Sequence, residues 1–329
     1  MRSRLLAAAM SATVLAATLS GCITVHGETA VVPAIGRAEA KKVLDNFTEV
    51  NNEANRTYDA ELNATIEAGA IGAIDQSGLR AHKKVHPEGN QDFTPLELTD
   101  ARFLIPKQAG WPKSFVADTE SNRGNGGRWY LVFQRNAVDE DWKVTYLAVV
   151  AEEKAPEFRF DSKGHVEDVP LEGTPGGKSS KPGTAIAPGA MSEAYTDYLQ
   201  NGGSGWADGP HTSGWRSERE ANAEKPGLRT EWADVPAEPP RFEPFALRTR
   251  DGGALVFFAS QHHKKQTVAK GYSPKIDDPY LKAILQGDPG QSVTYLQLSE
   301  QAVLVPSAAD GGDAEFLSRV AWPVEVKGS

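Results

Sequence analysis

Histidine is the residue type in this chain best suited to metal binding or proton transfer, and the sequence contains seven. His82 and His86 are four positions apart, a spacing that would place both on one face of a helix. Pro87 follows at once, so only a very short helix would fit, and we expect a solvated loop. His262 and His263 follow a predicted strand, where adjacent residues point to opposite faces. We therefore expect surface histidines at a strand end and no metal site.

Two glycine-rich stretches come close to known motifs and fail at defined positions. Gly176-Gly177-Lys178-Ser179 lacks the first glycine of a phosphate-binding loop, because Glu172 occupies that position. Gly202-Gly203-Ser204-Gly205 differs from a nucleophile elbow, because Trp206 replaces the last glycine. The chain has no His-Glu-x-x-His run and no cysteine pair. The sequence therefore predicts no catalytic residue, metal or cofactor, although a triad that is assembled only by the fold stays open.

Three tryptophans give the one positive signal for a ligand site. Trp206, Trp215 and Trp232 lie in a stretch rich in glycine and proline, before the second predicted sheet. Their rings are candidates to line a pocket or a sugar-binding surface. The alternative is that the rings pack over the sheet as a lid, and this interpretation is the one that we favour.

The single cysteine, Cys22, stands at the end of an export signal. A short basic start is followed by an apolar run of about 15 residues from Leu5 to Leu19, which is shorter than the roughly 20 residues of a transmembrane helix. The run ends in Leu19-Ser20-Gly21-Cys22. This motif resembles the lipobox of bacterial lipoproteins. The resemblance implies cleavage before Cys22, diacylglycerol on its thiol and acyl chains such as palmitate, and so an anchor in the cell membrane on its extracytoplasmic face.

A change in composition divides the rest of the chain into two halves. Residues 163–190 are rich in Gly, Pro, Ser and Lys and have almost no large apolar residue after Leu171, so we expect a flexible linker. With Cys22 lipidated no disulfide is possible, and each half must be stabilised by its apolar core. The predicted organisation is therefore a signal peptide at 1–21, a lipidated tether at 22–35, a first α+β domain at 36–162, the linker at 163–190 and a second α+β domain at 191–329.

Each half begins with a predicted helix and continues with predicted strands. Residues 36–58 carry an apolar stripe at three- and four-residue spacing, which indicates an amphipathic helix. Residues 128–134 and 142–150 alternate in polarity around a polar turn, which indicates a hairpin. In the second half we expect a helix at 192–200 with Ser192 as its cap. Strands are expected at 242–250, 254–260, 292–298, 302–306 and 314–326.

Helices that are separate from an antiparallel sheet define the α+β class. A long amphipathic helix followed by a curved meander of strands resembles the NTF2-like (cystatin-like) cone. The segments that carry this resemblance are the 36–58 helix, the 128–134/142–150 hairpin and, in the second half, the 242–260 hairpin. The resemblance implies two domains, each with an N-terminal helix packed on a curved antiparallel sheet.

The formal net charge of −9 argues against nucleic-acid binding, which requires basic patches. We expect a non-enzymatic lipoprotein of the cell envelope that binds a small molecule or an envelope protein, with a cleft in a concave sheet face or between the halves. Two alternatives stay open: an isomerase- or dehydratase-type enzyme of the same fold, and a structural accessory of an envelope complex. A deep pocket with a shifted Asp, Glu or His would favour the enzyme.

Overall fold

The first half of the computed structural model combines three helices with a small antiparallel sheet. The structure describes residues 30–123, 126–171 and 183–329. The helices are α1 (Arg37–Thr57), α2 (Ala60–Asn63) and α3 (Gly69–Val85). The sheet has the order β2-β4-β5-β6, with β2 at Leu98–Leu104, β4 at Lys113–Ser121, β5 at Arg128–Arg135 and β6 at Lys143–Val150. A separate pair joins β1 (Val32–Pro33) to β3 (Lys107–Gln108).

The second half is built on a larger sheet with the order β11-β13-β12-β10-β8-β7, and β9 also pairs with β10. Its helices are α4 (Met191–Asn201), α5 (Ser213–Ala221) and α6 (Pro279–Ala283). Its long strands are β8 (Leu228–Pro236), β10 (Ala254–Val268), β12 (Ser292–Val305) and β13 (Glu315–Gly328). The short strands are β7 (Glu224–Lys225), β9 (Phe245–Arg248) and β11 (Leu285–Gln286). Two 3-10 turns, at Glu152–Lys154 and Pro188–Ala190, complete the elements.

Helix α1 forms where the apolar stripe predicts it. Leu44 and Phe47 are buried on the outer face of the small sheet, where Phe47 meets Phe133 edge to face at 5.8 Å between ring centroids. Phe115 stacks on the same Phe133 at 4.9 Å. The predicted hairpin is also confirmed, because β5 pairs with β6 in antiparallel register. The α+β class is therefore as expected.

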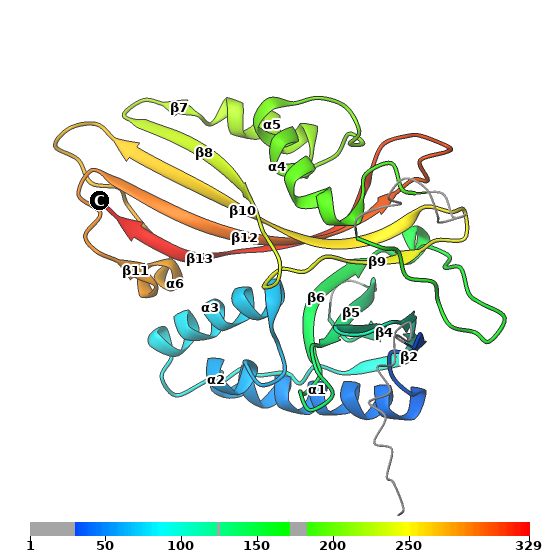
Figure 1. Cartoon of the computed structure of the whole chain (residues 1–329). Helices are drawn as coiled ribbons and strands as arrows, with labels where there is room; N and C mark the ends of the chain where they lie inside the picture. The colour runs from blue at the N-terminus through cyan, green and yellow to red at the C-terminus, as the bar shows by residue number, and fades with distance from the viewer. Residues whose placement is uncertain (1–29, 124–125, 172–182) are drawn as a thin grey trace, which may run out of the picture.

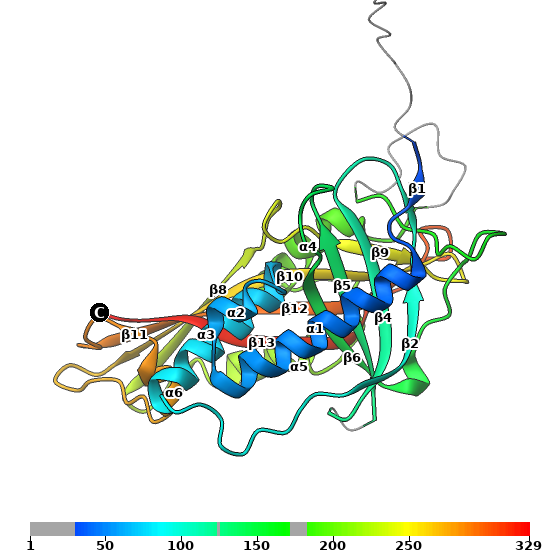
Figure 2. The ribbon, with the colours of Figure 1, turned by 90° about the horizontal axis from the view of Figure 1, so that it is seen from below.

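The two sheets pack against each other and share one apolar core. Figure 1 shows α1, α2 and α3 on one side of the molecule and α4 and α5 on the opposite side of the large sheet, and Figure 2 shows the first three helices from below. Tyr146 of β6 lies over Phe257 of β10 at 6.4 Å, and its hydroxyl donates to the carbonyl of Glu243 at 3.0 Å. The inner face of each sheet thus supplies the core of the other.

The segment expected to be a linker differs from that expectation at both ends. Val166 and Val169 are buried, and Asp168 forms a bridge with Leu247 of β9. Beyond the gap, Thr184 forms a bridge with Ser307. The linker was predicted from the high content of Gly, Pro, Ser and Lys in residues 163–190, and two valines within that segment did not change the prediction. Residues 172–182 lie outside the described part of the chain, as does Cys22 with the whole predicted signal.

Two further details of the second half were predicted wrongly. Residues 292–298 and 302–306 form one strand, β12, because Glu300 and Gln301 continue the ladder with β10 and β13. Ser192 does not cap α4; its hydroxyl donates instead to the carbonyl of Ala259 at 2.6 Å. The local sequence predicted a helix cap at Ser192 and a gap between two strands at Glu300 and Gln301. In the structure these polar side chains are buried within the second half.

None of the helices within the described residues combines the length and the apolar character needed to cross a membrane.

Candidate functional site

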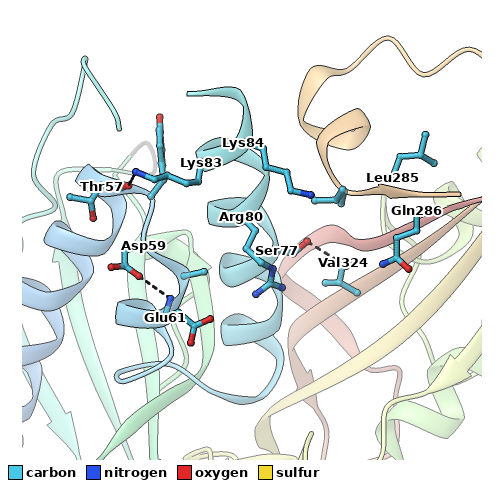
Figure 3. Close-up of a pocket in the computed structure, with 13 residues that line it drawn as sticks. Thr57, Asp59, Glu61, Ser77, Arg80, Lys83, Lys84, Leu285, Gln286 and Val324 are labelled. Atoms are coloured by element: carbon cyan, nitrogen blue, oxygen red, sulfur yellow. Dashed lines mark hydrogen bonds between the residues drawn. The ribbon is translucent and has the colours of Figure 1, made fainter. Parts of the chain in front are cut away.

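A cleft of about 700 Å³ lies between α3 and the end of the large sheet (Figure 3). Its volume falls in the range of small-molecule sites, roughly 300–1,000 Å³. The first half contributes the end of α1, the start of α2 and one face of α3, and the second half contributes Ile284 directly after α6, strand β11 and Val324 of β13. The cleft is lined by Thr57, Tyr58, Asp59, Ala60, Glu61, Ser77, Arg80, Lys83, Lys84, Ile284, Leu285, Gln286 and Val324.

The α3 wall of the cleft carries three cations at the spacing of one helix face. Lys83 Nζ donates to the carbonyls of Thr57 at 3.2 Å and Pro87 at 2.8 Å, and Lys84 Nζ donates to the carbonyl of Ala283 at 2.8 Å. These two lysines also complement the negative end of the α3 dipole. The guanidinium of Arg80 has no hydrogen-bond or ion-pair partner within the described residues. Arg80 is therefore the cation available to a ligand.

Carboxylates and apolar side chains line the cleft on different sides of α3, with Asp59 and Glu61 on one side and Leu285 and Val324 on the other (Figure 3). Asp59 caps α2 and accepts from the backbone N–H groups of Glu61 at 3.0 Å and Leu62 at 2.9 Å. Its carboxylate therefore already has hydrogen-bond partners in the protein. The carboxylate of Glu61 is exposed on the same side of the cleft (Figure 3). Ile284, Leu285 and Val324 supply the apolar lining from the second half. Besides the groups that already have protein partners, the cleft therefore offers the guanidinium of Arg80, the carboxylate of Glu61 and apolar side chains.

A stack of rings joins α3 to α6 at the rim of this cleft. The ring of His82 lies 4.9 Å from Tyr58 on one side and 4.1 Å from Tyr280 on the other. His86 Nε2 and the Tyr280 hydroxyl are 3.3 Å apart. Burial, and then the neighbouring His86, lower the pKa of His82. The expected solvated loop was wrong, because α3 continues to Val85 and its last turn is packed under these rings.

The structure brings together two of the three tryptophans singled out in the sequence. Trp215 and Trp232 meet edge to face at 5.9 Å, and the guanidinium of Arg219 lies 3.6 Å from the first ring and 4.3 Å from the second. Both line a cavity of about 310 Å³ with Lys264, whose pKa is lowered by burial. Trp206 is buried separately under α4, 5.2 Å from Tyr195.

Below these tryptophans, three neighbouring strands place Asp234, His262 and Ser299 in the order of a catalytic triad. His262 Nδ1 lies 2.5 Å from Asp234 Oδ1, and His262 Nε2 lies 2.8 Å from Ser299 Oγ. Burial lowers the pKa of His262 to about 4, so its ring is neutral at pH 7. The expectation of a surface histidine was wrong, because β10 continues to Val268 and His262 is fully buried.

The surroundings of this cluster favour a structural role. Ser299 is 0% exposed, so no substrate contacts its hydroxyl in this conformation. Gln301 donates to Ser299 Oγ at 2.5 Å and to Ser260 Oγ at 2.9 Å, so the Ser299 hydroxyl has a second side-chain partner besides His262. Arg219 binds both oxygens of Asp234, at 2.7 and 3.0 Å. The cluster is thus a buried hydrogen-bonded network that joins three neighbouring strands, although Gln301 Oε1 and Arg219 Nε are buried in it without a partner.

Within the part of the chain that the structure describes, no group of three or more His, Cys, Asp or Glu side chains is arranged to hold a metal ion.

Fold and site together define an α+β protein of two packed sheets with a ligand-sized cleft between its halves. Residues 31–328 match the family model described as a domain of unknown function, DUF8094, and the chain therefore belongs to that family. It is 46% identical over 318 residues to the uncharacterized lipoprotein SCO2278 of Streptomyces coelicolor, covering 97% of this chain and 93% of that protein. It is 44% identical over 319 residues to an uncharacterized lipoprotein of Streptomyces avermitilis, with the same two coverages.

A more distant relative is the uncharacterized lipoprotein SCO6871 of Streptomyces coelicolor, 24% identical over 84% of this chain and 78% of its own. No solved structure matches the chain.

Proposed function

We propose that this protein is a membrane-anchored lipoprotein that binds a small zwitterionic ligand, an amino acid or short peptide, in the cleft beside α3. The observation that carries the proposal is the unpartnered guanidinium of Arg80 inside a cavity of about 700 Å³. A guanidinium binds a carboxylate through two parallel hydrogen bonds, which gives both affinity and orientation.

The anchor is the acylated Cys22 on the extracytoplasmic face of the cell membrane. Its support is the motif Leu19-Ser20-Gly21-Cys22 and the lipoprotein names of relatives that align over 97% of this chain. The NTF2-like relationship is also a proposal. It is supported by the packing of α1 on the small antiparallel sheet and of α4 on the large one.

The ligand class follows from the order of groups along the cleft. Arg80 on α3 fits a carboxylate, and Glu61 at the start of α2 fits an ammonium group. The apolar side chains of Ile284, Leu285 and Val324 fit an aliphatic side chain between or beside them. The carboxylate of Glu61 would repel a purely anionic molecule and attract an ammonium group, so both charges are part of the proposal.

The test is isothermal titration calorimetry with alanyl-leucine and two blocked forms. We expect alanyl-leucine to bind, and both the C-terminal amide and the N-acetyl peptide to bind more weakly. The Arg80→Met variant should lose about 10- to 100-fold in affinity for the free peptide, since a charged hydrogen bond contributes about 1.5–3 kcal/mol. The same variant should discriminate little between the free peptide and its amide.

Lys42→Met is the matched control, because Lys42 is an exposed cation on α1 that does not line the cleft. Equal binding of the free and amidated peptides by the wild-type protein would refute a role for Arg80 as a carboxylate site.

A further inference from the structure

Three segments distant in sequence lie side by side where the described chain begins. Strand β1 pairs with β3, which places Val32 opposite Gln108. Pro106 and Phe160 each form a bridge with Val166. Lys107 Nζ binds the Asp161 carboxylate at 2.6 Å and ties the last two segments together. The start of the described chain, the β3 region and residues 160–166 therefore form one continuous surface.

This surface collects exposed apolar side chains. Of the seven large apolar residues exposed in the described residues, three lie on these segments and a fourth, Trp111, lies three positions after the end of β3. They are Val31 (62% exposed), Val32 (45%), Trp111 (44%) and Phe160 (48%), and we call them the tether face. The remaining three, Val138, Val235 and Tyr272, come from three separate segments. Single exposed apolar residues are common on proteins, but a group of four marks an interaction site.

We propose that the tether face docks on the phospholipid bilayer that holds the acyl chains of Cys22. The proposal rests on the anchor proposed above. Val31 is nine positions after Cys22, a distance that spans at most about 30 Å when the chain is fully extended. The anchor therefore keeps the tether face at a high effective concentration beside the membrane, where even weak apolar contacts are occupied.

The composition of the tether face suits the boundary between headgroups and acyl chains. Tryptophan is enriched at that depth, because its ring is apolar and its N–H donates to polar groups. The guanidinium of Arg135 lies 5.2 Å from the Trp111 ring and supports it from the protein side. All four side chains of the tether face are uncharged, so we do not expect attraction to anionic lipid to drive the contact. Docking is therefore apolar and insensitive to salt.

This orientation also leaves the ligand cleft accessible. Figures 1 and 2 place β1 and the C-terminus at opposite ends of the molecule. The cleft includes β11, which pairs with the C-terminal end of β13. A molecule that rests on its tether face thus presents the cleft away from the membrane.

The experiment measures tryptophan fluorescence of the full lipidated chain in phosphatidylcholine vesicles whose acyl chains are brominated near the headgroup. Bromine quenches only rings that it contacts. We expect quenching in the wild-type protein and its loss in Trp111→Phe. Trp232→Phe is the matched control and should keep the quenching. A Val31→Ser, Val32→Ser double variant should reduce it. Quenching should persist between about 0.1 and about 1 M salt, where the screening length falls from about 10 to about 3 Å.

Intact mass of the same samples separates the two proposals. Acyl mass on Cys22 without quenching would overturn docking and leave the anchor standing. Absence of acyl mass would overturn the anchor and docking together. Equal quenching of Trp111→Phe and the wild-type protein would assign the contact to another tryptophan and so refute the tether face. Peptide binding by Arg80 is measured independently of all three outcomes.

Discussion

At the scale of single residues, Asp234 compensates a cation that is buried between two tryptophan rings. Its carboxylate accepts both hydrogen bonds from Arg219, which is 8% exposed, and a third contact from His262. Asp234→Asn removes the charge and leaves the guanidinium without a counter-ion. We expect the free energy of unfolding to fall by about 3–5 kcal/mol, the usual cost of breaking a buried ion pair from one side. Urea unfolding followed by circular dichroism measures it.

The control is Glu231→Gln on the same strand. Glu231 pairs with Arg229 at 3.0 Å, but both side chains are at least half exposed. An exposed pair contributes at most about 1 kcal/mol, so this change should be small. If Asp234→Asn were no more destabilising than Glu231→Gln, the buried network would not stabilise the fold.

The residues of the candidate sites could be predicted from the sequence only in part. Trp215 and Trp232 stood out by type and context, and the fold brings them together. Arg80 did not stand out, because an exposed helical arginine has no local signature and its availability depends on where Thr57 and Ala283 satisfy its neighbours. His262 was misassigned because its partners Asp234 and Ser299 lie 28 and 37 positions away.

At the scale of elements, prediction succeeded where one periodicity is sustained. Helix α1 and the β5–β6 hairpin repeat their apolar spacing over their whole length, so their positions follow from the sequence. Strand β10 was predicted to end at Ser260, because Gln261 to Gln266 is entirely polar. Those residues continue as strand because β8 and β12 pair with them on both sides. The alternation of apolar and polar residues within one segment does not show which distant strands will pair with it, so the end of β10 could not be predicted.

The packing of α1 yields a direct test at this scale. Phe47 is 4% exposed and contacts the Phe133 ring of the small sheet. Phe47→Ala should lower the free energy of unfolding by about 3–5 kcal/mol through lost burial and the cavity left behind. Lys41→Ala on the exposed face, where Lys41 pairs with Asp45, should change it by no more than about 0.5 kcal/mol. Thermal and urea unfolding of both variants would show whether α1 is part of the core or only attached to it.

At the scale of the whole molecule, the two halves are held together by polar contacts as well as by the shared core. Val149 N–H donates to Ser318 Oγ at 3.0 Å, and Leu147 N–H donates to Glu300 Oε1 at 3.2 Å, so β6 is joined to the large sheet. These contacts span more than 150 positions, and no local pattern in the sequence indicates them. The composition of residues 163–190 predicted a boundary between two domains. The long-range contacts instead join the first half of the chain to the large sheet of the second half.

Three carboxyl groups meet at this junction and make its stability depend on pH. Burial is the main cause that raises the pKa of Glu300 and of Glu67, and the charge of Asp75 raises both further. Burial raises the pKa of Asp75 to about 6. Glu300 Oε2 and Glu67 Oε2 are buried without a hydrogen-bond partner. Each group thus binds its proton more tightly in the folded protein than in the unfolded chain, where the pKa of a glutamate is near 4.5.

The sign of the effect follows from that difference. Below pH 3.8, the ordinary pKa of an aspartate, the groups are mainly protonated in both states, and their stabilising effect is present. As pH rises, the unfolded chain releases its protons first, so this stability is lost until the folded pKa is passed. Glu300→Gln cannot ionise. Wild type and variant should therefore have similar stabilities at pH 4, and the variant should gain up to about 1.4 kcal/mol per pH unit above pH 5, the value for one proton.

Urea unfolding of wild type, Glu300→Gln and Glu49→Gln across this pH range provides the measurement. Glu49 is an exposed carboxyl on α1, outside the buried cluster, and its replacement is the matched control for the loss of one carboxylate. His262 must be kept in all three proteins, because its lowered pKa acts in the opposite direction: a neutral buried histidine loses stability as pH falls from about 6.5 to about 4. Subtracting each variant from wild type at every pH removes that contribution. A Glu300→Gln difference that does not change with pH would mean that Glu300 ionises in the folded protein as readily as in water.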